Sequence, residues 1–294
     1  MPSVVIAYPG NEDLAQSLAT QSGAELVPLE FRHFPDGEIY LRVAGDVGGK
    51  TAIIACGLER PNEKAIGLYL LASTLRELGA RRILLAAPYL GYMRQDRSFH
   101  PGEGMSARYF AQFLSSFLDG LVTVDPHLHR IHDLQEVYTV PTRVVAAAPA
   151  ISSWVASNVE APVLIGPDSE SEQWVSQVAQ GAKCPFVVLE KKRFGDRSVE
   201  VSVPDPGQLR DRTPVLIDDI ISTAKTMIAA VEHVVGAGLR PPVCVGVHAI
   251  FAGSAYGDLS RAGAARIVTC NTVPHPTNAI DVHTAVVRAV AELA

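Results

Sequence analysis

The feature that most constrains the fold is a series of short apolar runs, each followed by a longer amphipathic stretch. The runs are rich in Val, Ile and Leu, and they are continuous rather than alternating, as expected for strands buried on both faces of a sheet. There are nine of them, at 4–7, 52–55, 83–86, 121–124, 163–165, 186–189, 215–217, 243–247 and 267–269. This pattern predicts an α/β fold in which parallel sheets are covered by helices.

The intervening stretches have the period of helices. In 63–78 and 104–118 large apolar side chains recur three or four residues apart, which places them on one helical face. At the C-terminus, Val282, Val286 and Val290 form a similar stripe. We therefore predict a last helix that packs on the body of the protein.

The length and composition favour two domains. The chain has 294 residues, of which 48% are hydrophobic, enough for two sizeable cores. Between residues 146 and 163 the composition turns to Ala, Pro and Ser before a new apolar run begins. We predict domains at 1–147 and 148–294, and leave open whether the last helix packs back on the first domain.

Charge and targeting signals argue against a nucleic-acid-binding, a secreted or a membrane-spanning protein. A formal net charge of -6 argues against a protein that binds nucleic acid by neutralising phosphates. The N-terminus reads as a core strand rather than a signal peptide, and the longest uncharged run, 144–159, is interrupted by Pro149. The four cysteines form no CxxC pair. We expect a cytoplasmic protein with reduced, buried thiols and no membrane span.

One phosphate-binding motif is nearly present but lacks its context. Residues 44–51 resemble a Walker A loop, except that Ala44 stands at the first glycine position. A P-loop requires a helix directly after its lysine, whereas the residues after Lys50 have the character of a strand. The segment is predicted to be a turn.

The strongest local motif is the segment 213–226, which reads as a strand, an acidic pair, a turn and a helix. Asp218 and Asp219 would end the strand, where carboxylates can accept hydrogen bonds from ribose hydroxyls directly or act through a metal. The residues 222–226 offer backbone N–H groups and hydroxyls to a phosphate. A purely structural alternative is a helix capped by Ser222 or Thr223.

Other polar segments follow apolar runs or lie in turns. The segment 87–97 carries Arg94 and Arg97, whose planar guanidinium groups suit triphosphate oxygens, and Gln95 and Asp96, which can bind a nucleotide or orient the arginines. Shorter segments are 34–38, 124–129, 166–168 and 189–193. The structural alternatives are an acidic turn at 34–38, a merely structural His127, a turn dipeptide at 166–168 and a solvated basic edge at 189–193. The His-x-His spacing of 127–129 also leaves a transition-metal site as an alternative.

Taken in order, these segments resemble the ribose-phosphate pyrophosphokinase family over essentially the whole chain. The string Pro-Tyr-Leu-Gly-Tyr-Met-Arg-Gln-Asp-Arg at 88–97 is similar to a signature of that family, and 213–226 resembles the phosphoribosyl-diphosphate loop that the family shares with phosphoribosyltransferases. Phe34-Pro-Asp-Gly-Glu38, Val-Asp-Pro-His127, Pro-Asp168 and Lys191-Lys-Arg193 resemble further family segments. Residues 99–103 are similar to the archaeal-type branch.

The resemblance implies two tandem phosphoribosyltransferase-type, Rossmann-like domains, with the active site in the cleft between them. The first would bind ATP and the second ribose 5-phosphate, and the enzyme would transfer the β,γ-diphosphate of ATP to the 1-hydroxyl of the sugar. It also implies a homo-oligomer whose ATP site lies near a subunit interface, and Mg²⁺ held by His127 and Asp168. The implied ATP ligands are Phe34, Asp36, Glu38, Arg94, Gln95 and Asp96; the implied ribose 5-phosphate ligands are Asp218, Asp219, Ser222, Thr223, Ala224, Lys225 and Thr226; the implied catalytic groups are Lys191, Arg193 and His127.

The chain departs from the family pattern at two places. Ala224-Lys225 stands where the family has a glycine pair, Ser222 replaces an aspartate, and Glu170 lies where pyrophosphate is expected. Lys225 is expected to compensate by adding positive charge. Two alternatives follow from these departures and from the shared loop: a non-catalytic regulatory homologue of the synthetases, and a phosphoribosyltransferase that consumes their product.

Overall fold

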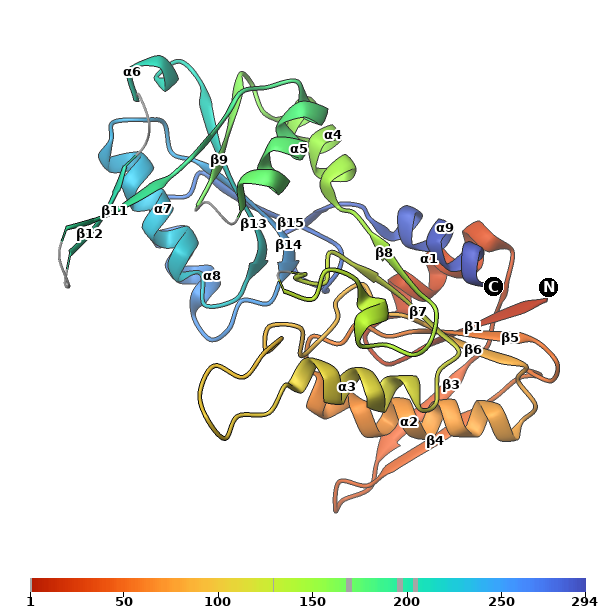
Figure 1. Cartoon of the computed structure of the whole chain (residues 1–294). Helices are drawn as coiled ribbons and strands as arrows, with labels where there is room; N and C mark the ends of the chain where they lie inside the picture. The colour runs from red at the N-terminus through yellow and green to blue at the C-terminus, as the bar shows by residue number, and fades with distance from the viewer. Residues whose placement is uncertain (1, 129, 168–170, 195–197, 203–205) are drawn as a thin grey trace. The chain divides into compact units, whose positions relative to one another are not determined.

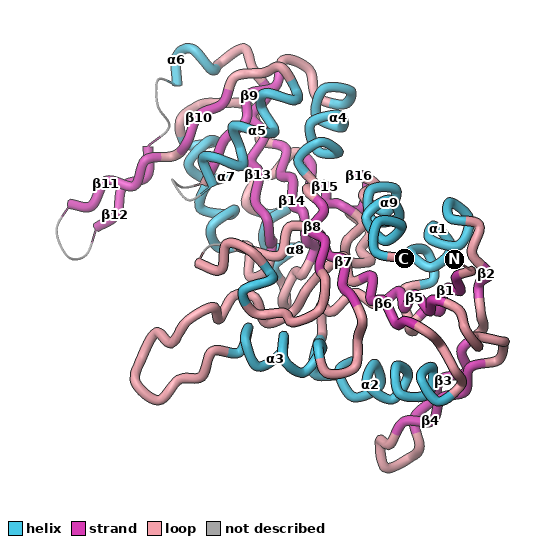
Figure 2. Tube along the Cα trace, turned by 45° about the vertical axis from the view of Figure 1, so that its right-hand side comes forward, coloured by secondary structure: helices cyan, strands magenta, loops and turns pink. Residues whose placement is uncertain are grey.

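The computed structural model describes the whole chain except residues 1, 129, 168–170, 195–197 and 203–205 (Figure 1). It contains two compact units, one formed by residues 1–145 and 283–294 and the other by residues 146–282. Each unit has its own sheet and helices. Figure 2 shows helices in cyan and strands in magenta.

The sheet of the first unit has six strands in the order β2-β1-β5-β6-β7-β8, and every neighbouring pair is parallel. The strands are β1 Ser3–Ala7, β2 Glu25–Leu26, β5 Thr51–Ala55, β6 Arg82–Ala86, β7 Gly120–Val124 and β8 Thr142–Val145. The central strand β5 is buried along its whole length. Its continuous apolar sequence follows from this burial, because helices cover both faces of the sheet.

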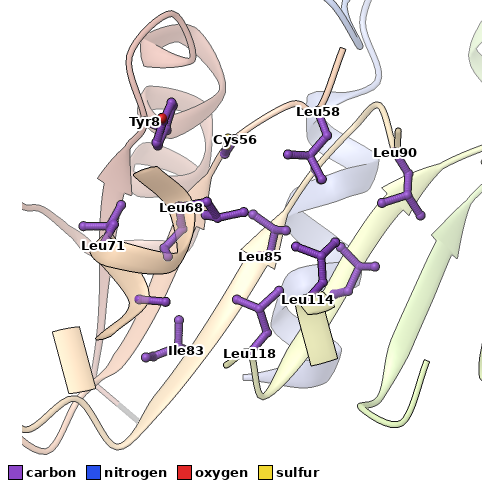
Figure 3. Packing of buried hydrophobic residues seen from close by; sticks show 14 of the residues in the cluster. Tyr8, Cys56, Leu58, Leu68, Leu71, Ile83, Leu85, Leu90, Leu114 and Leu118 are labelled. Atoms are coloured by element: carbon purple, nitrogen blue, oxygen red, sulfur yellow. The ribbon is translucent and has the colours of Figure 1, made fainter. Parts of the chain in front are cut away.

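Two pairs of helices cover this sheet. Helices α2 (Pro61–Glu77) and α3 (Ser106–Ser115) lie on one face, and α1 (Glu12–Ser22) and α9 (His283–Leu293) lie on the other (Figure 1). Leu68 and Leu71 of α2, Leu114 of α3 and Leu85 of β6 belong to one buried cluster (Figure 3). The last helix thus completes the core of the first unit, with its buried residues facing β6, β7 and β8.

An antiparallel hairpin extends from the first unit. It consists of β3 (Leu29–His33) and β4 (Ile39–Val43), and it is separate from the six-stranded sheet. Leu29, Phe31 and Leu41 pack against the core of the unit, whereas the intervening polar residues face outward. This alternation of apolar and polar side chains is typical of strands that have one face on the core and one face exposed to solvent.

The second unit repeats the strand pattern of the first. Its sheet has the order β10-β9-β13-β14-β15-β16, and all neighbours are again parallel. The strands are β9 Pro162–Gly166, β10 Phe186–Val188, β13 Thr213–Ile221, β14 Val243–Ala249, β15 Arg266–Cys270 and β16 Asn278–Ile280; the helices are α4 Ala148–Asn158, α5 Glu172–Ala182, α6 Pro206–Leu209, α7 Lys225–Gly236 and α8 Ala255–Arg261. A separate hairpin joins β11 (Glu190–Phe194) to β12 (Ser198–Ser202).

The structure confirms the predicted fold class. All nine apolar runs are strands of the two parallel sheets, and the predicted helices correspond to α2, α3 and α9. The sequence reading missed both hairpins and the edge strands β2, β8 and β16. These strands are short or partly exposed, so they lack the continuous apolar run that marked the central strands.

The Walker-like segment ends in β5 rather than in a helix, and Lys50 forms an ion pair with Glu25 (3.4 Å), so the prediction of a turn is confirmed. Of the cysteines, Cys56, Cys244 and Cys270 are buried free thiols, whereas Cys184 is only partly buried, so the expectation was wrong for that residue. Burial raises the pKa of Cys56 and of Cys244 to about 12.

No helix in the described part of the chain combines the length and the apolar character of a bilayer span.

The position of α9 leads to a prediction about stability. Val286 is fully buried in this helix, and Arg288 is exposed on it. Val286→Ala should lower the free energy of unfolding of the first unit by about 2 kcal/mol, because it removes two buried carbon atoms and leaves a cavity. The matched control Arg288→Ala should change it by less than about 0.5 kcal/mol.

The two tryptophans, Trp154 and Trp174, both lie in the second unit and report on it separately. In guanidinium titrations Val286→Ala should move the far-ultraviolet circular dichroism transition and leave the tryptophan fluorescence transition in place. A shift confined to the fluorescence would contradict the assignment of α9 to the first unit.

Candidate functional site

Polar loops of the first unit meet at the carboxyl edge of its sheet, because parallel strands all end on the same side. Backbone hydrogen bonds join the loops that follow β5, β6 and β7: Leu58 N–H donates to Tyr89 O (2.9 Å), and Val124 N–H donates to Pro88 O (3.2 Å). Asn11, buried after β1, accepts the Gly57 N–H at its Oδ1 (2.7 Å). The edge is therefore a connected layer of loops.

The segment 94–97 belongs to this layer and separates into exposed and anchored residues. Arg94 and Arg97 are exposed, whereas Gln95 accepts a hydrogen bond from the hydroxyl of Ser106 at the start of α3. The side chain of Asp96 is only 4% exposed, and Arg130 Nη1 lies 3.2 and 3.3 Å from its two oxygens. A carboxylate so deeply buried requires such a cation, so Asp96 anchors Arg130.

Arg130 also lies over the ring of Phe99, 5.9 Å from its centroid, and Arg97 lies over the same ring at 5.0 Å. Both distances are within the range of cation–π attraction. The cluster of Asp96, Arg97, Phe99 and Arg130 thus links the loop after β6 to the loop after β7. Arg130 was not predicted from the sequence, and only its position three residues after His127 could have suggested it.

The loop after β7 has an unusual backbone. Asp125 and His127 have φ angles of 33° and 54°, in the left-handed region that non-glycine residues rarely adopt, and His127 N–H donates to Asp125 O (2.9 Å). His127 is half-buried at the carboxyl edge of the sheet. Such strain concentrates at binding and catalytic sites.

The segment 34–38 forms the tip of the β3–β4 hairpin. Phe34 N–H donates to Glu38 O (2.7 Å), Asp36 accepts the Glu38 N–H (3.3 Å), and Gly37 has a φ of 93° that permits the tight turn. Next to this tip, the guanidinium carbon of Arg32 lies 4.5 Å from the centroid of the Phe34 ring and 4.3 Å from that of Tyr40. The tip residues Phe34, Asp36 and Glu38 are exposed.

In the second unit, the end of β13, the turn after it and the start of α7 hold all seven predicted ribose 5-phosphate ligands. Asp218 and Asp219 are half-buried in β13, and their carboxylates accept the N–H groups of Asp219 (3.0 Å) and Ile220 (2.8 Å). Thr223, Lys225 and Thr226 are exposed. The turn is thus open to solvent next to two carboxylates.

Ala224 shapes the start of α7. It precedes the first helical residue with φ 57° and ψ 6°, a left-handed conformation that glycine adopts more easily. Its methyl group is buried, and it has no side chain that could cap the helix. The first N–H groups of α7 therefore have no cap from this position, and they form the kind of donor set that binds phosphate.

Neighbouring loops hold this turn in place. Phe251 N–H donates to Ile221 O (2.9 Å), and Ala252 N–H donates to Ser222 O (3.0 Å). Phe251 in turn packs on His275, with ring centroids 4.6 Å apart. Burial lowers the pKa of His275, which favours its neutral form.

The remaining predicted site residues are only partly covered by the structure. Lys191 and Arg193 lie in β11, where they pair with Val201 and Val199 of β12. Asp168, Glu170 and His129 lie outside the described residues. In the described part of the chain, no three His, Cys, Asp or Glu side chains are grouped closely enough to hold a metal ion.

Of the two predicted magnesium ligands, the carboxylate of Asp168 is of the kind that Mg²⁺ takes together with substrate phosphates, whereas the imidazole of His127 offers nitrogen, a less common ligand for this ion. Mg²⁺ commonly takes one or two protein groups and completes its shell with phosphate oxygens and water. The strained backbone at His127 places one such group at the sheet edge.

Comparisons with known proteins agree with this architecture. Residues 3–117 match the family model for the N-terminal domain of ribose phosphate pyrophosphokinase, and residues 134–286 match the model for a phosphoribosyl transferase domain. The structure superposes on phosphoribosylpyrophosphate synthetase from Mycobacterium smegmatis with a TM-score of 0.86, at 24% identity and with 100% of both chains covered. At this identity the likeness concerns the fold.

Curated relatives extend the match along the whole chain. A ribose-phosphate pyrophosphokinase from Methanopyrus kandleri is 33% identical over 294 residues, with 99% of each chain covered. One from Methanothermobacter thermautotrophicus is 31% identical, with 95% of this chain and 96% of the relative covered. These relatives are archaeal. With both parts of the chain matched in order, the protein belongs to the ribose-phosphate pyrophosphokinase family.

Proposed function

We propose that the protein is a ribose-phosphate diphosphokinase, which transfers the β,γ-diphosphate of ATP to the 1-hydroxyl of ribose 5-phosphate and yields phosphoribosyl diphosphate and AMP. Two curated relatives that match 95% or more of this chain are named ribose-phosphate pyrophosphokinase. The observation that carries the proposal is the β13–α7 turn, in which two carboxylates precede an uncapped helix start. One small site can thereby hold ribose hydroxyls and a phosphate.

In this proposal, the second unit binds the sugar phosphate. Asp218 and Asp219 accept hydrogen bonds from the 2- and 3-hydroxyls of ribose, because carboxylates are strong acceptors at the end of a strand. Ser222, Thr223, Ala224 and Thr226 offer N–H groups or hydroxyls to the 5-phosphate, and Lys225 adds positive charge. The exposure of Lys225 supports this role.

The first unit binds ATP. Arg94 and Gln95 contact the nucleotide, together with Phe34, Asp36 and Glu38 of the hairpin tip, which a neighbouring subunit contributes. Asp96, also an expected ATP ligand, has its buried carboxylate bound by Arg130, so in this proposal it positions that guanidinium group. Arg94 and the hairpin-tip residues are exposed, and Gln95 is partly buried.

Mg²⁺ would be held by His127 and Asp168, and when bound it neutralises negative charge on the ATP phosphates. The attacking 1-hydroxyl and the leaving AMP oxygen must lie in line on opposite sides of the β-phosphorus, so positioning contributes most of the rate. Lys191 and Arg193 stabilise the charge that develops on the transferred group. The cytoplasm remains the predicted compartment, and a homo-oligomer the predicted assembly.

A direct assay tests the proposed reaction. Purified protein with Mg²⁺, ATP and ribose 5-phosphate should form AMP, and ribose 1-phosphate should not replace the acceptor because its 1-oxygen already carries phosphate. Protein that binds ATP but yields no AMP would be a regulatory homologue. Pyrophosphate release that requires a purine or pyrimidine base would instead identify a phosphoribosyltransferase.

Two lysines should affect the kinetics differently. Lys191→Ala should lower kcat by about two orders of magnitude or more and leave the KM for ribose 5-phosphate nearly unchanged, because its charge acts on the transition state. Lys225→Ala should raise that KM about tenfold and largely preserve kcat, since it removes a ground-state contact to the 5-phosphate. Steady-state measurement of AMP formation distinguishes the two. An unchanged kcat in Lys191→Ala would remove this residue from the mechanism.

The ion pair between Asp96 and Arg130 predicts energetic coupling. Asp96→Asn and Arg130→Ala should each raise the KM for ATP about tenfold, because each frees the loops that the pair joins. The double variant should be no worse than either single variant, since both remove one interaction. The KM for ribose 5-phosphate serves as the control. Effects on the ATP KM that multiply in the double variant would show that the two residues act separately.

A further inference from the structure

Three aromatic rings form a cluster in the second unit. Phe251 comes from the loop after β14, Tyr256 from the start of α8 and His275 from the loop after β15. The ring centroids of Phe251 and His275 are 4.6 Å apart, and that of Tyr256 lies 5.5 Å from the first and 5.3 Å from the second. Both contacts of Tyr256 are edge-to-face, an arrangement that aromatic pairs prefer. The ring cluster thus joins the loops after β14 and β15.

Phe251 connects the ring cluster to the β13–α7 turn. Its N–H donates to Ile221 O at the end of β13 (2.9 Å), and the N–H of Ala252 donates to Ser222 O (3.0 Å). Phe251 has a φ of 38°, in the left-handed region that bulky residues seldom enter. Such a conformation persists only where the surrounding structure holds it. The contacts of the Phe251 ring therefore decide where these two N–H groups meet the turn.

The ring of His275 is oriented by its own loop. Thr277 N–H lies 3.3 Å from His275 Nδ1, and because a backbone N–H can only donate, Nδ1 accepts and carries no proton. The Thr277 hydroxyl, 2.8 Å from the same nitrogen, then donates to it as well. The backbone of His275 is held too, since its N–H donates to Asn278 Oδ1 (3.0 Å). The imidazole is therefore neutral, with its proton on Nε2.

A chain of hydrogen bonds anchors this ring to β15. Thr277 and Thr269 of β15 are both buried, and their hydroxyl oxygens are 2.8 Å apart. Because the Thr277 hydroxyl donates to His275, the Thr269 hydroxyl donates to Thr277, and it accepts in turn from Asn278 Nδ2 (2.9 Å). All donors in the chain are directed toward His275. Burial lowers the pKa of His275, and a protonated Nδ1 would also face two donors, so both effects favour the neutral ring.

We propose that His275 is a positioning residue for the ribose 5-phosphate site: its neutral ring, held by Thr277, supports Phe251, which together with Ala252 fixes the backbone of the β13–α7 turn. A phosphate site built from N–H groups binds best when those groups are already in place. In this scheme His275 contacts no substrate and acts only through Phe251. The identity of the ligand rests on the proposed function, whereas the support of the turn does not.

Hydrogen–deuterium exchange of the full chain tests the support of the turn. In His275→Ala and in Thr277→Val, peptides that contain the amides of Phe251 and Ala252 should exchange at least about tenfold faster, because these donors are no longer held against the turn. Thr277→Ser keeps a hydroxyl for Nδ1 and should exchange like the wild type. Phe186→Ala is the matched control, since Phe186 is an aromatic residue 37% exposed on β10 of the same unit. It should leave these peptides unchanged.

Steady-state kinetics tests the consequence for the ligand. His275→Ala should raise the KM for ribose 5-phosphate about tenfold and leave kcat and the KM for ATP within about threefold of the wild type, because only the sugar-phosphate site loses its geometry. His275→Phe keeps a ring against Phe251 but loses the bonds to Thr277, so its KM should fall between the two. It serves as the second variant if the alanine variant does not fold. Tryptophan fluorescence, which reports on the second unit, checks the folding of each variant.

The two measurements separate this proposal from the proposed function. Exchange that is unchanged in both His275→Ala and Thr277→Val would overturn the positioning role. So would faster exchange in an active variant whose KM for ribose 5-phosphate is that of the wild type, because the ligand would then not depend on the position of the turn. A wild-type protein that forms no AMP contradicts the proposed function alone, and the exchange rates still decide whether His275 holds the turn.

Discussion

The parallel strand ladders are the constraint on which the structure depends. In each unit, hydrogen bonding between parallel strands brings all carboxyl ends to one edge, and the crossover helices then cover both faces. Residues far apart in the sequence become neighbours there: the loop after β1 reaches that after β5 through Asn11, and the loop after β6 reaches that after β7 through Asp96 and Arg130. Many of the candidate site residues of both units lie in or next to these loops.

The sheets hold residues at their carboxyl edges in strained backbone conformations. His127 in the first unit and Ala224 in the second adopt left-handed backbone conformations that cost roughly 1–2 kcal/mol each for residues other than glycine. At Ala224 the surrounding bonds, especially that from Ala252 N–H to Ser222 O, hold the turn in this form. Alanine thus adopts a glycine-like geometry, so the departure from the family's glycine pair leaves an open turn before α7.

Much of the fold was predictable because central strands carry their own signal. The nine apolar runs and the helices α2, α3 and α9 were recognised from periodicity alone. The hairpins β3–β4 and β11–β12 were not recognised, because a short strand with a solvent-exposed face resembles a loop in sequence. Among candidate site residues, motifs predicted Arg94, Gln95 and the β13–α7 turn, but Arg130 belongs to no motif and is singled out only by its contact with Asp96.

The sequence alone determined the fold class and the family, because apolar periodicity and ordered polar segments are local properties of the chain. Only the tertiary structure decided how distant segments are used: that α9 completes the core of the first unit, that Asp96 binds Arg130, and that Tyr69 of α2 packs against Phe113 of α3. These features depend on which side chains meet across elements. Such contacts arise from packing in three dimensions, which a one-dimensional pattern does not encode.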